Sequence, residues 1–196
     1  MFELAFIEQC ADPGIEMAIV ERFISEVGTD NPLAITISEG NRLILPDVPR
    51  TPEAAMRLIE RFVGQAVVRV GVTSYPAGHG ISDVSQLNPD LVDTCGNIRM
   101  GTALFGKVYR IVVHARGEAN RAVFAEALDA WRTGMFDGRY VFGQTDPEPF
   151  PEDDPDTYRP ENEVEVEPPQ DFPLLENAGT LDPHVADIRV DISVLD

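Results

Sequence analysis

Basic residues, cysteines and long apolar runs are all scarce in this chain of 196 residues. Its 15 Lys and Arg residues face 34 Asp and Glu residues, which gives a formal net charge of −19. Contacts to nucleic-acid phosphates and to anionic lipids need clustered bases, so we predict neither direct nucleic-acid binding nor an anionic-membrane anchor. No apolar run approaches the roughly 20 residues of a membrane span. The N-terminus, MFELAFIEQC, carries acids where a signal peptide carries bases.

The two cysteines, Cys10 and Cys95, are too few for a disulfide scaffold. Both occupy apolar positions of predicted helices, so we expect them to pack as small buried hydrophobic side chains and not as a redox pair. Together with the lack of a leader, this predicts a cytoplasmic protein in a reducing compartment.

Acidic residues and prolines are concentrated in the last quarter of the chain. Residues 1–144 hold 18 acidic and 13 basic side chains, whereas residues 145–196 hold 16 acidic and two basic ones, with nine of the 16 prolines. Ordering each residue costs about 1–2 kcal/mol, which the few large apolar side chains there do not offset. We therefore predict a globular body (1–144), an acidic Pro-rich disordered spacer (145–186) and a strand-like C-terminal segment (187–196). The spacer is interpreted as a solvated linker or as an acidic lure for a basic partner.

The body has the pattern of an α+β domain in which helices pack on a small mixed or antiparallel sheet. Helical patterns cover much of the first 27 residues, with a start signal at Asp12-Pro13, and then 51–63, about 90–115 and 118–133. Residues 33–38 and 42–45 predict a β-hairpin, and 139–142 a short strand. The β-branched run 66–73 predicts a central strand that is covered on both faces.

The longest predicted helix, 90–115, carries two adjacent apolar stripes. One stripe steps by alternating fours and threes from Leu91 to Val112, and Leu104, Val108 and Ile111 form the second. An apolar face of this width favours a central core helix over the alternative, an oligomeric coiled coil.

The loop SYPAGHG (74–80) follows the predicted central strand, a common place for functional groups. With Arg69, its neighbourhood offers Tyr75, His79 and Asp83 as candidate anion- or ligand-binding residues. GHGISD resembles a truncated Gly-x-Gly-x-x-Gly, but Asp83 replaces the third glycine and no P-loop lysine is present. A Ser74/His79/Asp83 triad lacks the Gly-x-Ser-x-Gly elbow. We therefore expect a structural loop, no catalytic residues and no cofactor.

The three histidines, His79, His114 and His184, show no metal-ligand spacing, so no metal site is expected.

The C-terminal segment DIRVDISV (187–194) alternates strictly between apolar and polar residues. Its period of two places Ile188, Val190, Ile192 and Val194 on one face of a strand. These four side chains are the candidate partner-binding residues. Two routes are open: the segment pairs with an edge of the body's own sheet, which we favour and which a partner could displace, or it adds a strand to a partner's sheet.

Several stretches resemble the TraH family of conjugal-transfer proteins from tumour-inducing and related rhizobial plasmids. They are GQAVVRVGVTSYPAG (64–78), EQCADPGIEMAIVERF, NPLAITI, RLIL, NPDLVDTCGNIRMGTALFGKVYRIV, AWRTGMFDG and the terminal ADIRVDISVLD. The likeness runs essentially end to end, although the acidic middle of the tail matches only in composition. It implies involvement in plasmid conjugation, with a protein partner in the transfer machinery. It implies no catalytic or metal-binding position, and Ser74 stands where family members are expected to have Gln.

Two hypotheses for function follow. The first is a non-enzymatic cytoplasmic adaptor of the conjugal-transfer system. The alternative is a small enzyme or an anion- or ligand-binding protein that uses the Ser74–Asp83 loop and Arg69. A deep pocket collecting Arg69, Tyr75, His79 and Asp83 would favour the alternative, and a filled surface there would favour the adaptor.

Overall fold

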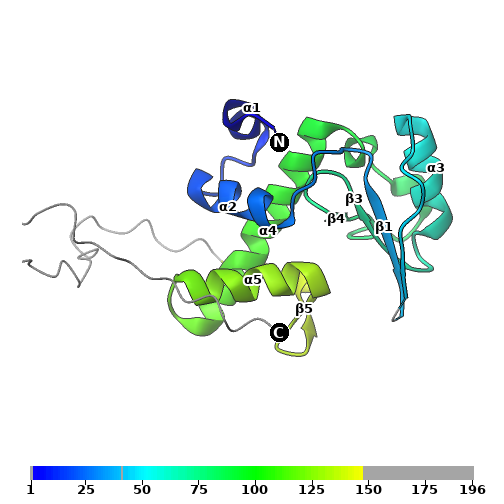
Figure 1. Cartoon of the computed structure of the whole chain (residues 1–196). Coiled ribbons are helices and arrows are strands. Elements are labelled where there is room, and N and C mark those ends of the chain that lie inside the picture. The colour runs from blue at the N-terminus through cyan, green and yellow to red at the C-terminus, as the bar shows by residue number, and fades with distance from the viewer. Residues whose placement is uncertain (1, 41, 148–196) are drawn as a thin grey trace, which may run out of the picture. The chain divides into compact units, whose positions relative to one another are not determined.

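The computed structural model describes residues 2–40 and 42–147, which belong to one compact unit, Met1–Glu152. It confirms the α+β class (Figure 1). The helices are α1 (Leu4–Cys10), α2 (Met17–Val27), α3 (Pro52–Phe62), α4 (Thr94–Arg116) and α5 (Arg121–Thr133), with 3₁₀ turns η1 (Val84–Gln86), η2 (Pro89–Leu91) and η3 (Val141–Gly143). The strands are β1 (Ile35–Glu39), β2 (Arg42–Ile44), β3 (Val67–Val70), β4 (Tyr75–Pro76), β5 (Met135–Phe136) and β6 (Arg139–Tyr140).

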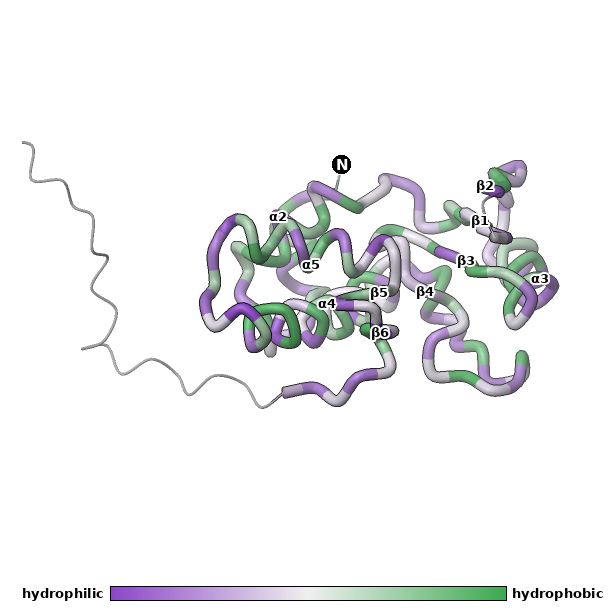
Figure 2. The backbone as a smooth tube through the Cα atoms, turned by 90° about the horizontal axis from the view of Figure 1, so that it is seen from below, coloured by the Kyte–Doolittle hydropathy of each residue, from purple (hydrophilic) through white to green (hydrophobic). Residues whose placement is uncertain are grey.

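Four strands form an antiparallel sheet in the order β2-β1-β3-β4. The predicted hairpin is therefore confirmed as β1 and β2. Strands β5 and β6 form a separate hairpin. Its two-residue turn consists of Asp137 and Gly138, which both have positive φ, as this type of tight turn requires. Seen from below, α2, α4 and α5 gather at one end of the body, and the sheet with α3 forms the other end (Figure 2).

The two faces of the sheet differ in their cover. Ile35, Ile37, Val68 and Val70 are buried in the main core, together with residues of α3 and α4. On the opposite face, Val67 is 55% exposed, so the prediction that its strand is covered on both sides is wrong. The antiparallel sheet needs only one buried face, and the strand ends at Val70 because the chain turns there through a glycine with positive φ.

Helix α4 is the central core helix, as the apolar stripes predicted. Ile98, Phe105 and Val112 from the first stripe are buried, and so is the second stripe. The helix begins later than predicted, because Asn88 and Pro89 open the 3₁₀ turn η2 and Asp93 caps α4 by accepting a hydrogen bond from the Gly96 amide at 2.7 Å.

The N-terminal region differs from its prediction in two ways. Asp12 does not start a helix: its carboxylate accepts from the Gly14 amide at 2.8 Å in a turn, and α2 begins only at Met17. The two cysteines are not separate thiols. Cys10, the last residue of α1, forms a disulfide with Cys95 in the first turn of α4. The pair is 85 residues apart in sequence, so only the packing of α1 against α4 reveals it.

The predicted spacer begins inside the described residues. Arg110 of α4 donates two hydrogen bonds to the carboxylate of Asp146, at 2.9 and 2.7 Å, and so fixes the first residues after the body. The rest of the spacer and the segment 187–196 lie outside the described residues, and the predicted division of the tail stays a prediction. Within the part that the structure describes, no helix is long and apolar enough to cross a bilayer.

Candidate functional site

The chain that follows β3 is tied to α4 by a buried polar network. The side-chain amide of Asn97 donates to the carbonyls of Val70 and Leu91, at 3.1 and 2.9 Å. Its carbonyl oxygen accepts from the amide and the hydroxyl of Thr73, both at 2.9 Å. Trp131 of α5 donates its indole N–H to the Thr73 carbonyl at 3.2 Å. Every group in the network is satisfied, which favours the prediction of a structural loop.

Two glycines allow α4 and the chain after β3 to lie close together. A Cβ at Gly101 would overlap the side chain of Thr73, and a Cβ at Gly71 would overlap that of Asn97. Gly71 also has φ +72°, in the left-handed region. Gly71 and Gly101 are thus needed for the packing of the loop on α4.

Arg69 directs its guanidinium at backbone carbonyls. It donates to the carbonyls of Trp131 at 2.6 Å and Arg132 at 3.0 Å, and to that of Ser74 at 3.3 Å. The first two belong to the last turn of α5, the negative end of the helix dipole. The cation also lies 5.5 Å from the centre of the Phe142 ring. Burial lowers the pKa of Arg69 to about 10, so the group remains a cation at neutral pH. Its donors are engaged in holding the sheet to α5.

The rings of Tyr75 and His79 lie close to one another. Their ring centres are 6.5 Å apart, and His79 lies 5.8 Å from Phe142. Burial raises the pKa of Tyr75, so it stays a neutral phenol. Burial, and to a lesser degree Lys107, lowers the pKa of His79, so its imidazole is neutral at pH 7. His79 lines a hollow of about 410 Å³, which it shares with Ser38, Gly78 and Tyr140 among others.

Asp83 has a local structural role. Its carboxylate accepts from the Ser85 amide at 2.8 Å, and the side-chain oxygen of Gln86 accepts from the Asp83 amide, so the pair forms a capping box on η1. The hydrogen bonds with Ser85 lower the pKa of Asp83. The structure thus places Tyr75 beside His79, and puts Arg69 and His79 at different hollows, neither of which Asp83 lines. Ligand binding by these four residues stays a prediction.

A larger groove, of about 690 Å³, lies on the open face of the sheet. We call it the sheet-face groove. One wall is formed by Thr36, Ser38, Leu43 and Val67, and Arg69 contributes beside them. The register explains the grouping, since Ser38 pairs with both Leu43 and Val67 and Thr36 pairs with Arg69. The remaining lining comes from the ends of α2 and α5 (Glu26, Val27, Trp131, Arg132 and Thr133), with Gly40 and Ser74.

Two exposed aliphatic side chains lie among the polar and charged residues of the sheet-face groove. Leu43 is 63% exposed and Val67 is 55% exposed, although both are large aliphatic residues on strands. Its charged rim is a weak pair, in which Arg132 lies 3.9 Å from the Glu26 carboxylate and donates to its carbonyl at 3.1 Å. Exposed aliphatic side chains of this kind are typical of surfaces that contact other proteins.

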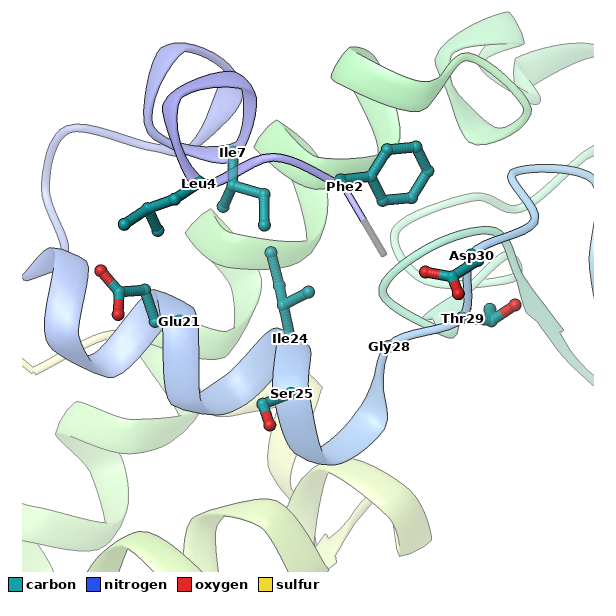
Figure 3. A pocket seen from close by; sticks show the side chains of 9 residues that line it. All are labelled: Phe2, Leu4, Ile7, Glu21, Ile24, Ser25, Gly28, Thr29 and Asp30. Carbon is teal, nitrogen blue, oxygen red and sulfur yellow. The ribbon is translucent and has the colours of Figure 1, made fainter.

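A second apolar hollow, of about 410 Å³, lies between α1 and α2 (Figure 3). Ile7 and Ile24 point toward one another across it, with Leu4 beside them. Among residues 2–40 and 42–147, no group of three or more His, Cys, Asp or Glu side chains is arranged to hold a metal ion.

Sequence reasoning missed both apolar surfaces. The signal for the sheet-face groove was present, because ITISE and VVRV alternate between apolar residues and Thr36, Ser38 and Arg69. This alternation is typical of strands with one solvated face. The α1–α2 hollow had no such signal, since its walls meet only through the tertiary packing around the disulfide.

Comparisons with known proteins agree with the resemblance noted from the sequence. The chain is 45% identical over 154 residues to an uncharacterized protein, y4dP, from Sinorhizobium fredii (strain NBRC 101917 / NGR234). The match covers 75% of this chain and 76% of that protein. No solved structure matches the chain. The TraH_2 family model matches residues 1–196, the full length, and such membership suggests a role in conjugal transfer. The chain belongs to the TraH_2 family.

Proposed function

We propose that this protein acts in conjugal transfer as a non-enzymatic adaptor, which binds another protein of the transfer machinery through the sheet-face groove. The observation that carries the proposal is the exposure of Leu43 and Val67, on either side of Ser38, on one open sheet face. Aliphatic side chains exposed together beside a groove are typical of surfaces that bind other proteins.

The chemistry around the groove supports an adaptor over the alternative of a ligand-binding enzyme. Arg69, the cation expected to bind an anion, donates to three carbonyls and stacks near aromatic rings. Asp83 caps a 3₁₀ turn instead of facing His79. A catalytic site needs such groups to converge on a reacting atom, and these do not.

The predicted strand 187–194 is the second element of the proposal, and it lies outside the described residues. We propose that it adds to a partner's sheet, because the free edges of the described sheet are short. Edge strand β2 has three residues and β4 has two, one of them Pro76, which has no amide donor. An eight-residue segment would form few main-chain hydrogen bonds with either of these edge strands.

The test is conjugation by cells that carry a double substitution, Leu43→Asp and Val67→Asp. Charge on the open face should reduce plasmid transfer at least about tenfold, because a desolvated carboxylate at an apolar contact costs more than 1.4 kcal/mol of binding free energy. The melting temperature should hardly change, since both side chains are exposed. Co-purification should show the matching loss of one identified transfer protein.

The control is Val84→Asp, which puts one such charge on another exposed apolar residue, on η1 and away from the groove. It should transfer the plasmid normally. Normal transfer by the double variant, or an equal loss with Val84→Asp, would contradict the proposal. Val190→Asp tests the terminal segment in the same assay and is expected to weaken transfer without altering the melting of the body.

The cytoplasmic location stays a prediction, and the cysteines provide a measurement that bears on it. Cytoplasmic thiols are kept reduced, whereas disulfides persist in oxidising compartments. Alkylation of intact cells before lysis, followed by mass spectrometry, reports the state of Cys10 and Cys95. An unmodified, oxidised pair, as in the structure, would contradict the cytoplasmic prediction. Two alkylated thiols would support it.

A further inference from the structure

Helix α1 is held to the rest of the body by few contacts besides the disulfide. Only Ile7 and Cys10 of its seven residues are buried, and its N-cap residue, Glu3, makes no side-chain capping bond. An isolated helix shorter than about 12 residues is marginal in water even with a favourable sequence. The persistence of α1 therefore depends on its attachment to α4, to which the bond from Cys10 to Cys95 joins it covalently.

The surface beneath α1 is a small apolar cluster that is separate from the main core. Its buried members are Cys10, Val72 and Ile98, and the last two have no exposed surface. Phe2 and Phe6, from the N-terminal segment, pack against this cluster. Departure of α1 and of the residues before it would therefore uncover Val72 and Ile98.

The chain around this cluster is anchored independently of α1. Thr73, which follows the first aliphatic residue of the cluster, donates its amide and its hydroxyl to the side chain of Asn97, both at 2.9 Å. The Asp12 amide donates to the hydroxyl of Thr102 on α4, also at 2.9 Å. Once the disulfide is cut, the residues before Asp12 are joined covalently to the body at that point alone. Helix α1 can then detach while the body keeps its fold.

The disulfide is also within reach of a reductant. Cys10 is 1% exposed, whereas Cys95, in the first turn of α4, is only partly buried. Access to a sulfur is one of the factors that set the rate of thiol–disulfide exchange, and exposed disulfides include the labile and regulatory ones. Neither cysteine belongs to the main core, so reduction removes no contact from that core.

We propose that the Cys10–Cys95 disulfide is a redox switch that controls the position of α1. In the oxidised protein, α1 covers Val72 and Ile98. In the reduced protein, α1 leaves α4 and exposes this apolar surface, while the main core stays folded. The switch goes beyond the adaptor function and does not require it, because no residue of α1 lines the sheet-face groove.

The reaction is thiol–disulfide exchange with a reductant that is a thiol of the glutathione class. Its thiolate attacks Sγ of Cys95, the more exposed cysteine, and the bond to Cys10 breaks. The electron pair of that bond goes to the Cys10 sulfur, which takes up a proton. A second thiolate attacks the reductant's sulfur in the mixed disulfide and releases Cys95, which is protonated in turn. Two reductant thiols are thereby oxidised to one disulfide, and the protein gains two thiols.

The experiment places the full-length protein in glutathione buffers that range from fully reduced to fully oxidised. Alkylation followed by mass spectrometry measures the fraction of reduced Cys10 and Cys95. Hydrogen exchange of α1 should become at least about tenfold faster in step with that fraction, because the helix detaches locally. Exchange in β3 and in the middle of α4 should stay slow. Return to the oxidised buffer should restore the protection of α1.

Proteolysis gives a second readout with a matched control. Glu8 is exposed on α1, and Glu60 is exposed on α3. A glutamate-specific protease should cleave after Glu8 at least about tenfold faster in the reduced protein than in the oxidised protein. Cleavage after Glu60 should be equally slow in both states, because the disulfide does not hold α3.

The Cys10→Ser/Cys95→Ser double variant should show fast exchange and fast cleavage of α1 in every buffer, while near-UV dichroism of the buried Trp131 reports a folded core. Protection of α1 in the reduced, folded protein would overturn the switch, because noncovalent contacts would then suffice. Joint loss of protection in α1, β3 and α4 would overturn it as well, since the bond would then stabilise the whole body. A disulfide that resists reduction in the folded protein would contradict the switch and indicate a permanent structural bond.

Discussion

The two faces of the four-stranded sheet carry alternate residues of the same strands, yet they differ in what they contact. The closed face presents Ile37 and Val70, which are fully buried against the helices. The open face presents Leu43 and Val67, which are more than half exposed, together with the half-buried Arg69. The open face also carries Thr36 and Ser38, so the two faces differ in residue type as well as in burial.

The comparison teaches which substitutions report on folding and which report on function. A buried aliphatic side chain contributes through contacts that are lost when it is shortened, and the cavity adds to the loss. An exposed aliphatic side chain makes few such contacts. If its substitution changes plasmid transfer, the change therefore reflects lost contact with a partner. The following predictions test that division.

The largest effect is expected on the closed face. Ile37→Ala should lower the free energy of unfolding by about 2–5 kcal/mol, because Ile37 is fully buried in the centre of β1. Leu43→Ala on the paired strand should cost less than about 0.5 kcal/mol. Urea unfolding followed by Trp131 fluorescence measures both. Similar costs for the two variants would break the distinction between the faces.

The next largest loss of stability is expected at Asn97, which binds the chain where β3 ends. Asn97→Ala removes the donor to the Val70 carbonyl and the acceptor for Thr73. Buried groups left without partners cost about 1–3 kcal/mol each, so we expect a total loss of about 3 kcal/mol. The control is Asn31→Ala, which removes a single turn hydrogen bond to Leu33 and should cost under about 1 kcal/mol.

Arg69 is the exception that sharpens the comparison, since it is an open-face residue with a structural role. Arg69→Met keeps the aliphatic stem but leaves the carbonyls of the last turn of α5 without their donor. We expect a loss of about 2 kcal/mol in the free energy of unfolding. Arg132→Met, at a side chain that is 51% exposed, should cost much less. Unchanged stability of Arg69→Met together with weakened anion binding would instead favour the ligand-binding alternative.

The smallest effect is a pH dependence beside the open face. Burial holds the pKa of folded His79 below the value near 6.5 that it takes when unfolded. The unfolded chain therefore binds the proton more readily, and stability contributed by neutral His79 falls as the pH drops below about 6.5. Urea unfolding between about pH 7.5 and 5.5 should show a steeper loss in the natural protein than in His79→Gln. Equal slopes would show that His79 is not desolvated. Plasmid transfer by His79→Gln should be nearly normal.

Much of the local structure could be predicted because it depends on neighbours in sequence. Thr51 and Pro52 open α3, and the Thr51 hydroxyl caps it by accepting from the Ala54 amide. The alternation in 35–39 and the apolar stripes of α4 likewise predict the hairpin and the central helix. The start signal at Asp12 was misassigned because the same residue type caps helices and closes turns.

The sequence by itself determined the fold class, the hairpin, the central helix and the family likeness, since propensity, periodicity and charge act over short distances along the chain. Only the tertiary structure decided the disulfide, the engagement of Arg69 by α5, and which sheet face stays open. The two cysteines are 85 residues apart in sequence, and Arg69 is about 60 residues from the carbonyls that it binds in α5. No local pattern records such a contact, because it forms only when the helices pack on the sheet and leave part of the sheet uncovered.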